Sequence, residues 1–235
     1  MRCMAEAYNP GAQDWSLRRV LPAALGLPAA SILGALLLLT LSDGAPWAAA
    51  GGWSIGALLV LVALRARSRR AGLALPLGPG GTPPLPALLT GFGAALLLDT
   101  LAAAGGSSTP TPELAALVGR PATAATWLSA ALYVLLLQPL AEGLVFRGLL
   151  QPALQARAGR HRAILLTALA WVGLQLLVYS SAPTGASIGA LVATRLAGGL
   201  LLGILRARSD SARASIFAHA GLNLFALLRL PGLGV

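Results

Sequence analysis

The sequence predicts an all-α protein that crosses a membrane about seven times. Of its 235 residues, 57% are hydrophobic and only 10% are charged, and the mean hydropathy is +0.77. Roughly 25% of the residues of a soluble domain are charged, and disordered chains combine low hydrophobicity with high charge, so both classes are excluded. Apolar stretches long enough to cross about 30 Å of hydrocarbon recur along the chain.

Seven apolar segments have the required length, and stretches rich in glycine, proline and serine separate several of them. The first segment is too long, and too closely followed by others, to be a cleaved signal peptide. We expect a single transmembrane domain over residues 1–235. The predicted spans are Val20–Leu41, Trp47–Leu64, Pro86–Ala104, Ala124–Gln151, Ala163–Ser181, Gly185–Leu205 and Ala214–Leu230.

The basic residues predict the orientation of the chain. All 17 are arginines, the net charge is +10, and they gather in clusters between apolar runs. This distribution is typical of a multi-pass protein of the cell (inner) membrane in contact with lipids, and it argues against a nucleic-acid partner. Clusters on alternate loops place the N-terminus in the cytoplasm and the C-terminus outside. The clusters are Arg18 and Arg19 before the first segment, Arg65, Arg67, Arg69 and Arg70 after the second, Arg157, Arg160 and Arg162 after the fourth, and Arg206, Arg208 and Arg213 after the sixth.

Few side chains in the sequence are of the types that bind zinc. The sequence contains one cysteine, Cys3, and two histidines, His161 and His219, and it has no HExxH motif. A zinc site made from histidine and cysteine would need carboxylates to complete it. We therefore expect neither a metal nor a cofactor.

Several polar side chains lie inside the predicted spans, where each is costly and needs a reason. His219 and Asn223 are four residues apart and share one face of the last span. Trp171 and Gln175 have the same spacing in the fifth. Because Glu142 also lies in a predicted span, a functional role is favoured over helix packing for these residues.

Arg147 lies inside the fourth predicted span, where its charge needs a polar or charged partner. Glu142 is five residues before it, off a common α-helical face, and the position four residues before it is Gly143, which has no carboxylate. Asp99, in the third span, is the candidate partner.

These residues form three motifs that resemble those of the CPBP (Abi) intramembrane proteases, a family that includes CAAX prenyl endopeptidases. The resemblance covers the chain from about Ala124 to Leu230. The first motif of the family, Glu-Glu-x-x-x-Arg, is matched by Glu142-Gly-Leu-Val-Phe-Arg147, with glycine in place of the second glutamate. The second, Phe-x-x-x-His, is matched by Trp171-Val-Gly-Leu-Gln175, and the third, His-x-x-x-Asn, by His219-Ala-Gly-Leu-Asn223.

The resemblance implies an intramembrane endopeptidase that uses a glutamate-activated water. Glu142 is then the general base, and His219 and Asn223 stabilise the oxyanion. Gln175 can orient a water through its amide but cannot exchange a proton, while Arg147 and Trp171 have supporting roles. The implied substrate is a protein or peptide with a hydrophobic or lipid-modified tail, including a sorting tail of the myxosortase kind.

Two alternatives remain open at this point. The departures at Gly143 and Gln175 are compatible with a degenerate relative that binds a peptide or a membrane protein without cleaving it. An unrelated transporter or scaffold is the second alternative. It predicts that Glu142, Gln175 and His219 point to different helix interfaces.

Overall fold

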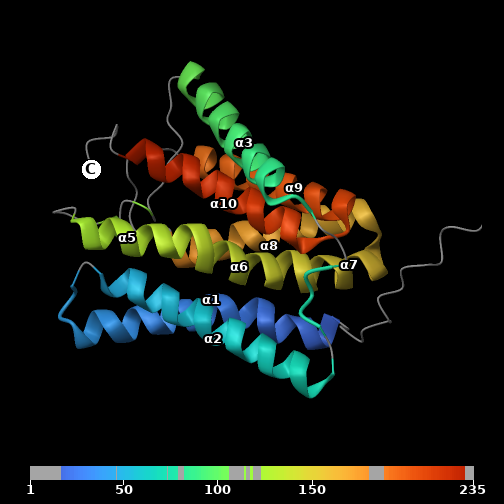
Figure 1. Ribbon diagram of the computed structural model, residues 1–235, viewed down its shortest axis with the longest axis horizontal. Helices are drawn as coiled ribbons and strands as arrows, with labels where there is room; N and C mark the ends of the chain where they lie inside the picture. Colours follow the sequence, from blue (N-terminus) through green and yellow to red (C-terminus); the bar gives the residue numbers. More distant parts are fainter. Residues whose placement is uncertain are drawn as a thin grey trace, which may run out of the picture.

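The computed structural model describes residues 17–45, 47–72, 74–78, 82–105, 114, 117–118, 123–179 and 188–230. Within these ranges the chain is built from helices and the turns between them (Figure 1). The all-α prediction is therefore confirmed. Six helical stretches are long and apolar enough to cross a membrane, as judged by length and composition.

The helices follow the predicted spans closely. The fourth span is one long helix, residues 124–158, made of five consecutive pieces. The seventh is α10, which has 18 residues. The helices are α1 (Leu17–Leu41), α2 (Ala48–Arg70), α3 (Pro84–Ala104), α5 (Ala124–Leu132), η1 (Tyr133–Leu137), α6 (Gln138–Glu142), η2 (Gly143–Leu150), α7 (Gln151–Ala158), α8 (Arg160–Tyr179), α9 (Ile188–Ser209) and α10 (Ala212–Arg229).

Some helix ends differ from the prediction because arginines continue the helices. The second span was expected to end at Leu64, yet α2 runs on to Arg70, and α8 begins at Arg160 rather than Ala163. Arginine has a high helix propensity, and at the C-terminus of α2 its positive charge also interacts favourably with the helix dipole. The arginine clusters therefore extend the helices beyond the apolar segments.

The long helix lies in the middle of the molecule. The α1–α2 hairpin packs on one side of it, and α8, α9 and α10 lie on the other, with α3 packed against α10 (Figure 1). As a result every residue from Ala141 to Gln151 is buried. This is the part of the chain that carries Glu142 and Arg147.

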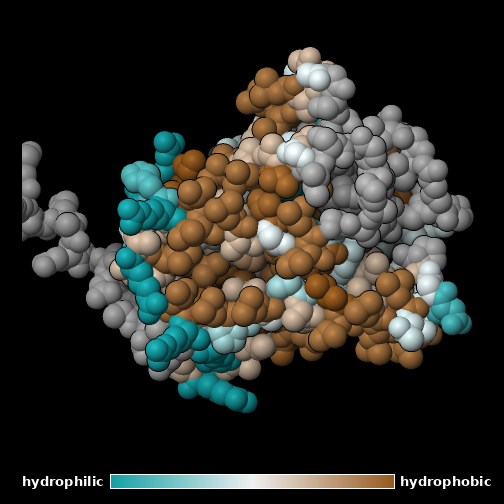
Figure 2. All heavy atoms as spheres, turned by 180° about the vertical axis from the view of Figure 1, so that it is seen from behind, coloured by the Kyte–Doolittle hydropathy of each residue, from teal (hydrophilic) through white to brown (hydrophobic). Residues whose placement is uncertain are grey.

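The outer surface is suited to lipid. Many large apolar side chains on the helices are exposed, such as Leu37 and Leu177 at 59% and 71%. Figure 2 shows a broad hydrophobic surface with hydrophilic residues gathered along one end. The C-terminal ends of α2, α7 and α9 come together at one end of the molecule (Figure 1), and each carries arginines. This arrangement matches the alternating arginine clusters of the sequence.

Two π-helical turns interrupt the long helix, and each is followed by the same local sequence. Leu-Leu-Gln-Pro occurs at 136–139, across the end of η1, and again at 149–152, across the end of η2. A proline inside a helix clashes with the carbonyl four residues earlier. The wider π turn relieves this clash before Pro139 and Pro152. Because π turns often mark functional sites, the position of Glu142 between the two is informative.

Candidate functional site

Glu142 is the centre of a buried polar cluster. Its side chain is 1% exposed, and both carboxylate oxygens accept hydrogen bonds. A carboxylate has about four sites for accepting hydrogen bonds, and here four donors occupy them. The donors are Gln138 Nε2 to Oε1 at 3.1 Å, Tyr179 OH to Oε1 at 3.1 Å, Trp171 Nε1 to Oε2 at 2.5 Å and Gln175 Nε2 to Oε2 at 2.9 Å.

Three of the donors come from one face of α8. Trp171, Gln175 and Tyr179 are spaced by four residues, so they lie one above another along the helix. The sequence predicted that Trp171 and Gln175 share a face, and both contact Glu142. Tyr179 was missed, although it continues the same four-residue spacing.

A second tyrosine extends the cluster. The hydroxyl of Tyr133 lies 2.7 Å from that of Tyr179, and both rings are buried. Trp53 of α2 packs edge-on against the Tyr179 ring, with a centroid distance of 4.9 Å. The N-terminal hairpin thus supports the site, although neither Trp53 nor Tyr133 was singled out from the sequence.

His219 reaches the cluster from α10. Its Nε2 lies 4.0 Å from Oε2 of Glu142, and its ring packs edge-on against Trp171 at a centroid distance of 5.5 Å. This separation is too long for a direct hydrogen bond, but one water can bridge it. Glu142, Gln175 and His219 therefore meet at one point, contrary to what the transporter or scaffold hypothesis predicts.

Asn223 joins the cluster through Gln138 rather than through Glu142. Its Nδ2 donates to the Val134 carbonyl at 2.7 Å and to Gln138 Oε1 at 3.1 Å. An amide nitrogen carries two hydrogens, and both are used here. Val134 lies in η1, where the π turn changes the hydrogen bonding of the helix backbone. Asn223 can serve an oxyanion only after releasing one of these acceptors.

Arg147 is buried beside the cluster, and its predicted partner was wrong. Asp99 instead forms an ion pair with Arg229 of α10. The reason is topological, because Asp99 lies near the end of α3 opposite to the arginine clusters, whereas Arg147 lies toward the clusters. Arg147 Nη2 donates to the Gly199 carbonyl at 3.2 Å, and its guanidinium carbon lies 5.1 Å from the Trp171 ring centroid.

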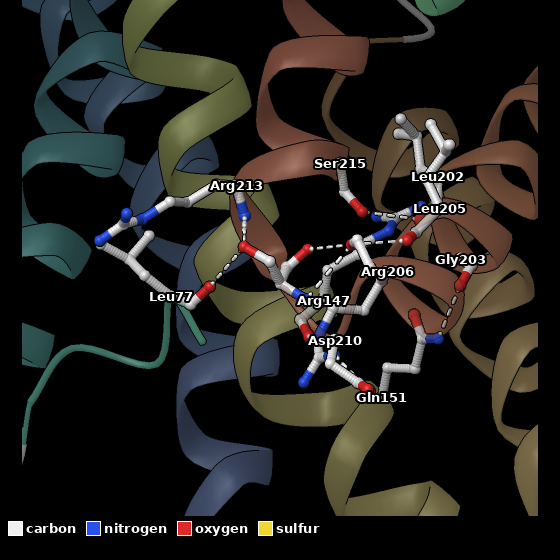
Figure 3. A network of polar contacts seen from close by, with 12 residues as sticks. Leu77, Arg147, Gln151, Leu202, Gly203, Leu205, Arg206, Asp210, Arg213 and Ser215 are labelled. Carbon is white, nitrogen blue, oxygen red and sulfur yellow. Dashed lines mark hydrogen bonds and ion pairs between the residues drawn. The ribbon is translucent and has the colours of Figure 1, made fainter. Parts of the chain in front are cut away.

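Figure 3 shows polar contacts of Arg147, Gln151 and Arg206 between the long helix and α9. Arg147 and Gln151 are four residues apart, and they donate to the carbonyls of Gly199 and Gly203, which are also four apart. In return, Arg206 Nε donates to the Arg147 carbonyl at 3.1 Å. Arg147 therefore links the long helix to α9.

Several buried polar atoms of the site have no hydrogen-bond partner among the described residues. Gln175 Oε1 and the Nε and Nη1 atoms of Arg147 make no hydrogen bond with the residues that the structure describes. Buried polar groups are normally paired with protein or with water. These atoms point to a bound water or to polar groups of a ligand.

The position of the missing second glutamate is filled by another side chain. A Cβ atom added at Gly143 would overlap Cγ1 of Ile216 on α10. Close packing between the long helix and α10 therefore occupies the space that a side chain at position 143 would need. Among the described residues, no group of three His, Cys, Asp or Glu side chains is placed to hold a metal ion.

The chain was compared with known protein families, curated proteins and solved structures. Residues 124–225 match the family model described as type II CAAX prenyl endopeptidase Rce1-like. The matched stretch begins at α5 and ends in α10, and it includes Glu142, its four donors and His219. No curated protein and no solved structure matches the chain.

Proposed function

Because the chain carries an Rce1-like domain, as expected of a member of the CPBP family of intramembrane endopeptidases, we propose that it hydrolyses a peptide bond with a water activated by Glu142. The proposed substrate is a membrane-associated protein whose C-terminal segment is hydrophobic or lipid-modified. The proposed location is the cell (inner) membrane, in keeping with a multi-pass helical protein.

The observation that carries this proposal is the gap between Glu142 and His219. The 4.0 Å between Oε2 and Nε2 accommodates a bridging water, and Gln175 holds the same carboxylate oxygen through its amide. The unpaired Oε1 of Gln175, on the same amide, is an acceptor for such a water within the described part of the chain. A water in this gap lies between the Glu142 carboxylate and the His219 ring, and both side chains are buried.

The proposed reaction follows from these positions. Glu142 takes a proton from the water as its oxygen attacks the substrate carbonyl, and the oxyanion that forms is stabilised by N–H groups of His219 and Asn223. Glu142 then passes the proton to the leaving amine as the carbon–nitrogen bond breaks. One water is consumed, and the products are a new carboxylate and a new amine.

This chemistry requires a rearrangement of the cluster. With four donors, the Glu142 carboxylate has no free site for the proton of a water. Asn223 similarly has both amide hydrogens engaged. Substrate binding must therefore displace at least one donor from Glu142 and one acceptor from Asn223.

The same saturation favours a second candidate function. A carboxylate whose acceptor sites are all occupied does not activate a water as it stands, and this favours a relative that binds a peptide or a membrane protein without cleaving it. In this function the cluster is a fixed polar part of a peptide-binding site.

Reconstitution in lipid vesicles separates the two functions. Peptides with an apolar tail, with a lipid-modified cysteine before the tail, and with a polar tail are incubated with wild type and with Glu142→Gln. Cleavage that depends on an apolar or lipid-modified tail and disappears in Glu142→Gln supports the endopeptidase. Binding of these peptides without cleavage by wild type supports the second function.

A further inference from the structure

The two oxygens of the Glu142 carboxylate have different surroundings. Oε2 faces Nε2 of His219 across the 4.0 Å gap, whereas Oε1 accepts hydrogen bonds from Gln138 and Tyr179. A water in the gap therefore meets Oε2. Oε1 is the oxygen through which the carboxylate can be held in place while Oε2 reacts.

The two donors to Oε1 of Glu142 differ in their other contacts. The side-chain oxygen of Gln138 accepts from Asn223, so Gln138 takes part in the hydrogen bonds that must rearrange. The Tyr179 hydroxyl instead lies 2.7 Å from the hydroxyl of Tyr133. A tyrosine hydroxyl carries one hydrogen. Because Tyr179 gives its hydrogen to Glu142, the hydrogen between the two tyrosines comes from Tyr133.

The two hydroxyls therefore form a chain with one direction. Tyr133 donates to Tyr179, and Tyr179 donates to Oε1 of Glu142. Hydrogen bonds in such a chain polarise one another in the interior of a protein, so the first bond strengthens the second. Tyr133 can thus act on the carboxylate through Tyr179.

Both tyrosine rings are fixed by packing. Tyr133 and Tyr179 are buried, and Trp53 of α2 packs against both of them. Its ring centroid lies 4.9 Å from that of Tyr179 and 6.1 Å from that of Tyr133. The three rings belong to three helices, α2, η1 and α8, and side chains in a close-packed interior have little room to move. The Tyr179 hydroxyl is therefore a fixed point for Glu142.

The π turn η1 explains how Tyr133 reaches the same tyrosine as Glu142. The two residues are nine positions apart, which is about two and a half turns of a regular α-helix and places them on opposite faces. Tyr133 begins η1, and the backbone N–H of Gln138 donates to its carbonyl, five residues earlier. This wider turn takes up an extra residue and rotates Tyr133 toward the face of Glu142. Both side chains then contact Tyr179 of α8.

We propose that Tyr179, backed by Tyr133, is a positioning residue that keeps hold of Oε1 of Glu142 throughout the reaction. Oε2 is then the oxygen that takes the proton from the water and passes it to the leaving amine. Neither tyrosine gains or loses a proton, and the donor that gives way to the water is not Tyr179. This inference rests on the proposed hydrolysis for the role of Glu142.

The first test is kinetic. It compares Tyr179→Phe, Tyr133→Phe and the double variant, as full chains in phosphatidylcholine vesicles, with the apolar-tailed peptide as substrate. Each change keeps the ring and removes one hydroxyl. We expect kcat to fall about tenfold in Tyr179→Phe and about threefold in Tyr133→Phe, with KM unchanged. Because Tyr133 acts through Tyr179, the double variant should have the same kcat as Tyr179→Phe alone.

Gln151→Leu is the matched control for these variants. It also removes a buried hydrogen bond between the long helix and a neighbouring helix, here the bond to the Gly203 carbonyl of α9. Because Gln151 has no part in the chain of hydroxyls, Gln151→Leu should keep the wild-type kcat. Thermal unfolding is measured for every variant, and Tyr133→Phe alone decides if Tyr179→Phe does not fold.

The second test is spectroscopic and needs no cleavage. The sequence contains three glutamates, Glu6, Glu113 and Glu142, so labelling with carbon-13 glutamate and subtracting the spectrum of Glu142→Gln isolates the infrared band of the Glu142 carboxyl group. The proposal predicts that this band shifts in Tyr179→Phe and shifts less in Tyr133→Phe. Tyr133→Phe should add no further shift to Tyr179→Phe, and Gln151→Leu should leave the band unchanged.

Four outcomes would overturn the proposal. A higher kcat in Tyr179→Phe would identify Tyr179 as the donor that must leave Glu142. Losses that multiply in the double variant would show that Tyr133 acts independently. An unshifted Glu142 band in Tyr179→Phe would show that the tyrosine does not hold the carboxylate, and an equal loss of kcat in Gln151→Leu would indicate general loosening. If wild type cleaves no peptide, the proposed hydrolysis fails, and the infrared result still decides whether the two tyrosines hold Glu142.

Discussion

A methyl group added at Gly143 tests why this chain lacks the second glutamate of the family pattern. In Gly143→Ala the new Cβ overlaps Cγ1 of Ile216, which belongs to the neighbouring helix α10. Isoleucine has one strongly preferred χ1 rotamer in a helix, so its Cγ1 cannot easily move away. We expect the two helices to be forced apart at the point where Glu142 faces His219.

The magnitude follows from two opposing terms. Overpacking of this kind costs about 1–3 kcal/mol, while alanine is preferred to glycine inside a helix by about 0.5–1 kcal/mol. The free energy of unfolding is therefore expected to fall by up to about 2.5 kcal/mol. In the Ile216→Ala background the overlap is absent, and Gly143→Ala becomes stabilising by about 0.5–1 kcal/mol.

The assay is unfolding of the purified protein by sodium dodecyl sulfate in mixed micelles, applied to all four members of the double-mutant cycle. Gly173→Ala in α8 is the control, because a Cβ there meets no atom within 4 Å, and it should stabilise the protein. If Gly143→Ala costs the same in both backgrounds, Ile216 does not fill the place of the missing side chain. The packing argument is then wrong.

Three further variants test separate parts of the structure. Tyr179→Phe removes one donor from Glu142 and keeps the ring, so unfolding should become easier by about 1–2 kcal/mol, measured in the same micelle assay. Gly221→Ala places a Cβ against the backbone of α3, which cannot move aside as a side chain does. We expect the free energy of unfolding to fall by about 3 kcal/mol and peptide binding to weaken. Unchanged peptide binding would contradict this prediction. Asp99→Asn breaks the ion pair with Arg229 far from Glu142, so stability should fall by about 1–3 kcal/mol while peptide binding stays at the wild-type level.

The helices and the centre of the site could be predicted from the sequence because both depend on short-range spacing. Trp171 and Gln175, four residues apart, share a face of α8, and both contact Glu142. His219 lies opposite them, 4.0 Å from the carboxylate. A span of apolar residues needs no tertiary information to be recognised, and a polar residue inside it stands out for its cost.

What the sequence did not reveal depends on contacts between helices. Gln138 and Tyr179 complete the shell of Glu142, and both were overlooked although spacing offered a signal: Gln138 is four residues before Glu142, and Tyr179 is four after Gln175. The prediction that Asp99 pairs with Arg147 was wrong because it rested on charge alone and ignored the position of each residue along its helix. Arg147 binds a carbonyl of α9, a type of partner that every residue offers.

The π turns explain a further limit of the spacing argument. Asn223 was expected to act with His219, four residues away, yet its amide is engaged by η1 and by Gln138. Regular α-helical geometry gives no hint that Val134 has a carbonyl to offer there. The repeated Leu-Leu-Gln-Pro sequence was the available signal, since a proline in the middle of a helix requires a local change in hydrogen bonding.

The most direct test of the central claim is a single-turnover cleavage in water enriched in oxygen-18, with mass analysis of both the product and the protein. If Glu142 takes a proton from the attacking water, one oxygen-18 enters the new carboxylate of the product, Glu142 itself stays unlabelled, and Glu142→Gln forms no product. Label in the Glu142 side chain would instead show a covalent intermediate, and cleavage by Glu142→Gln would show that this carboxylate is not the base.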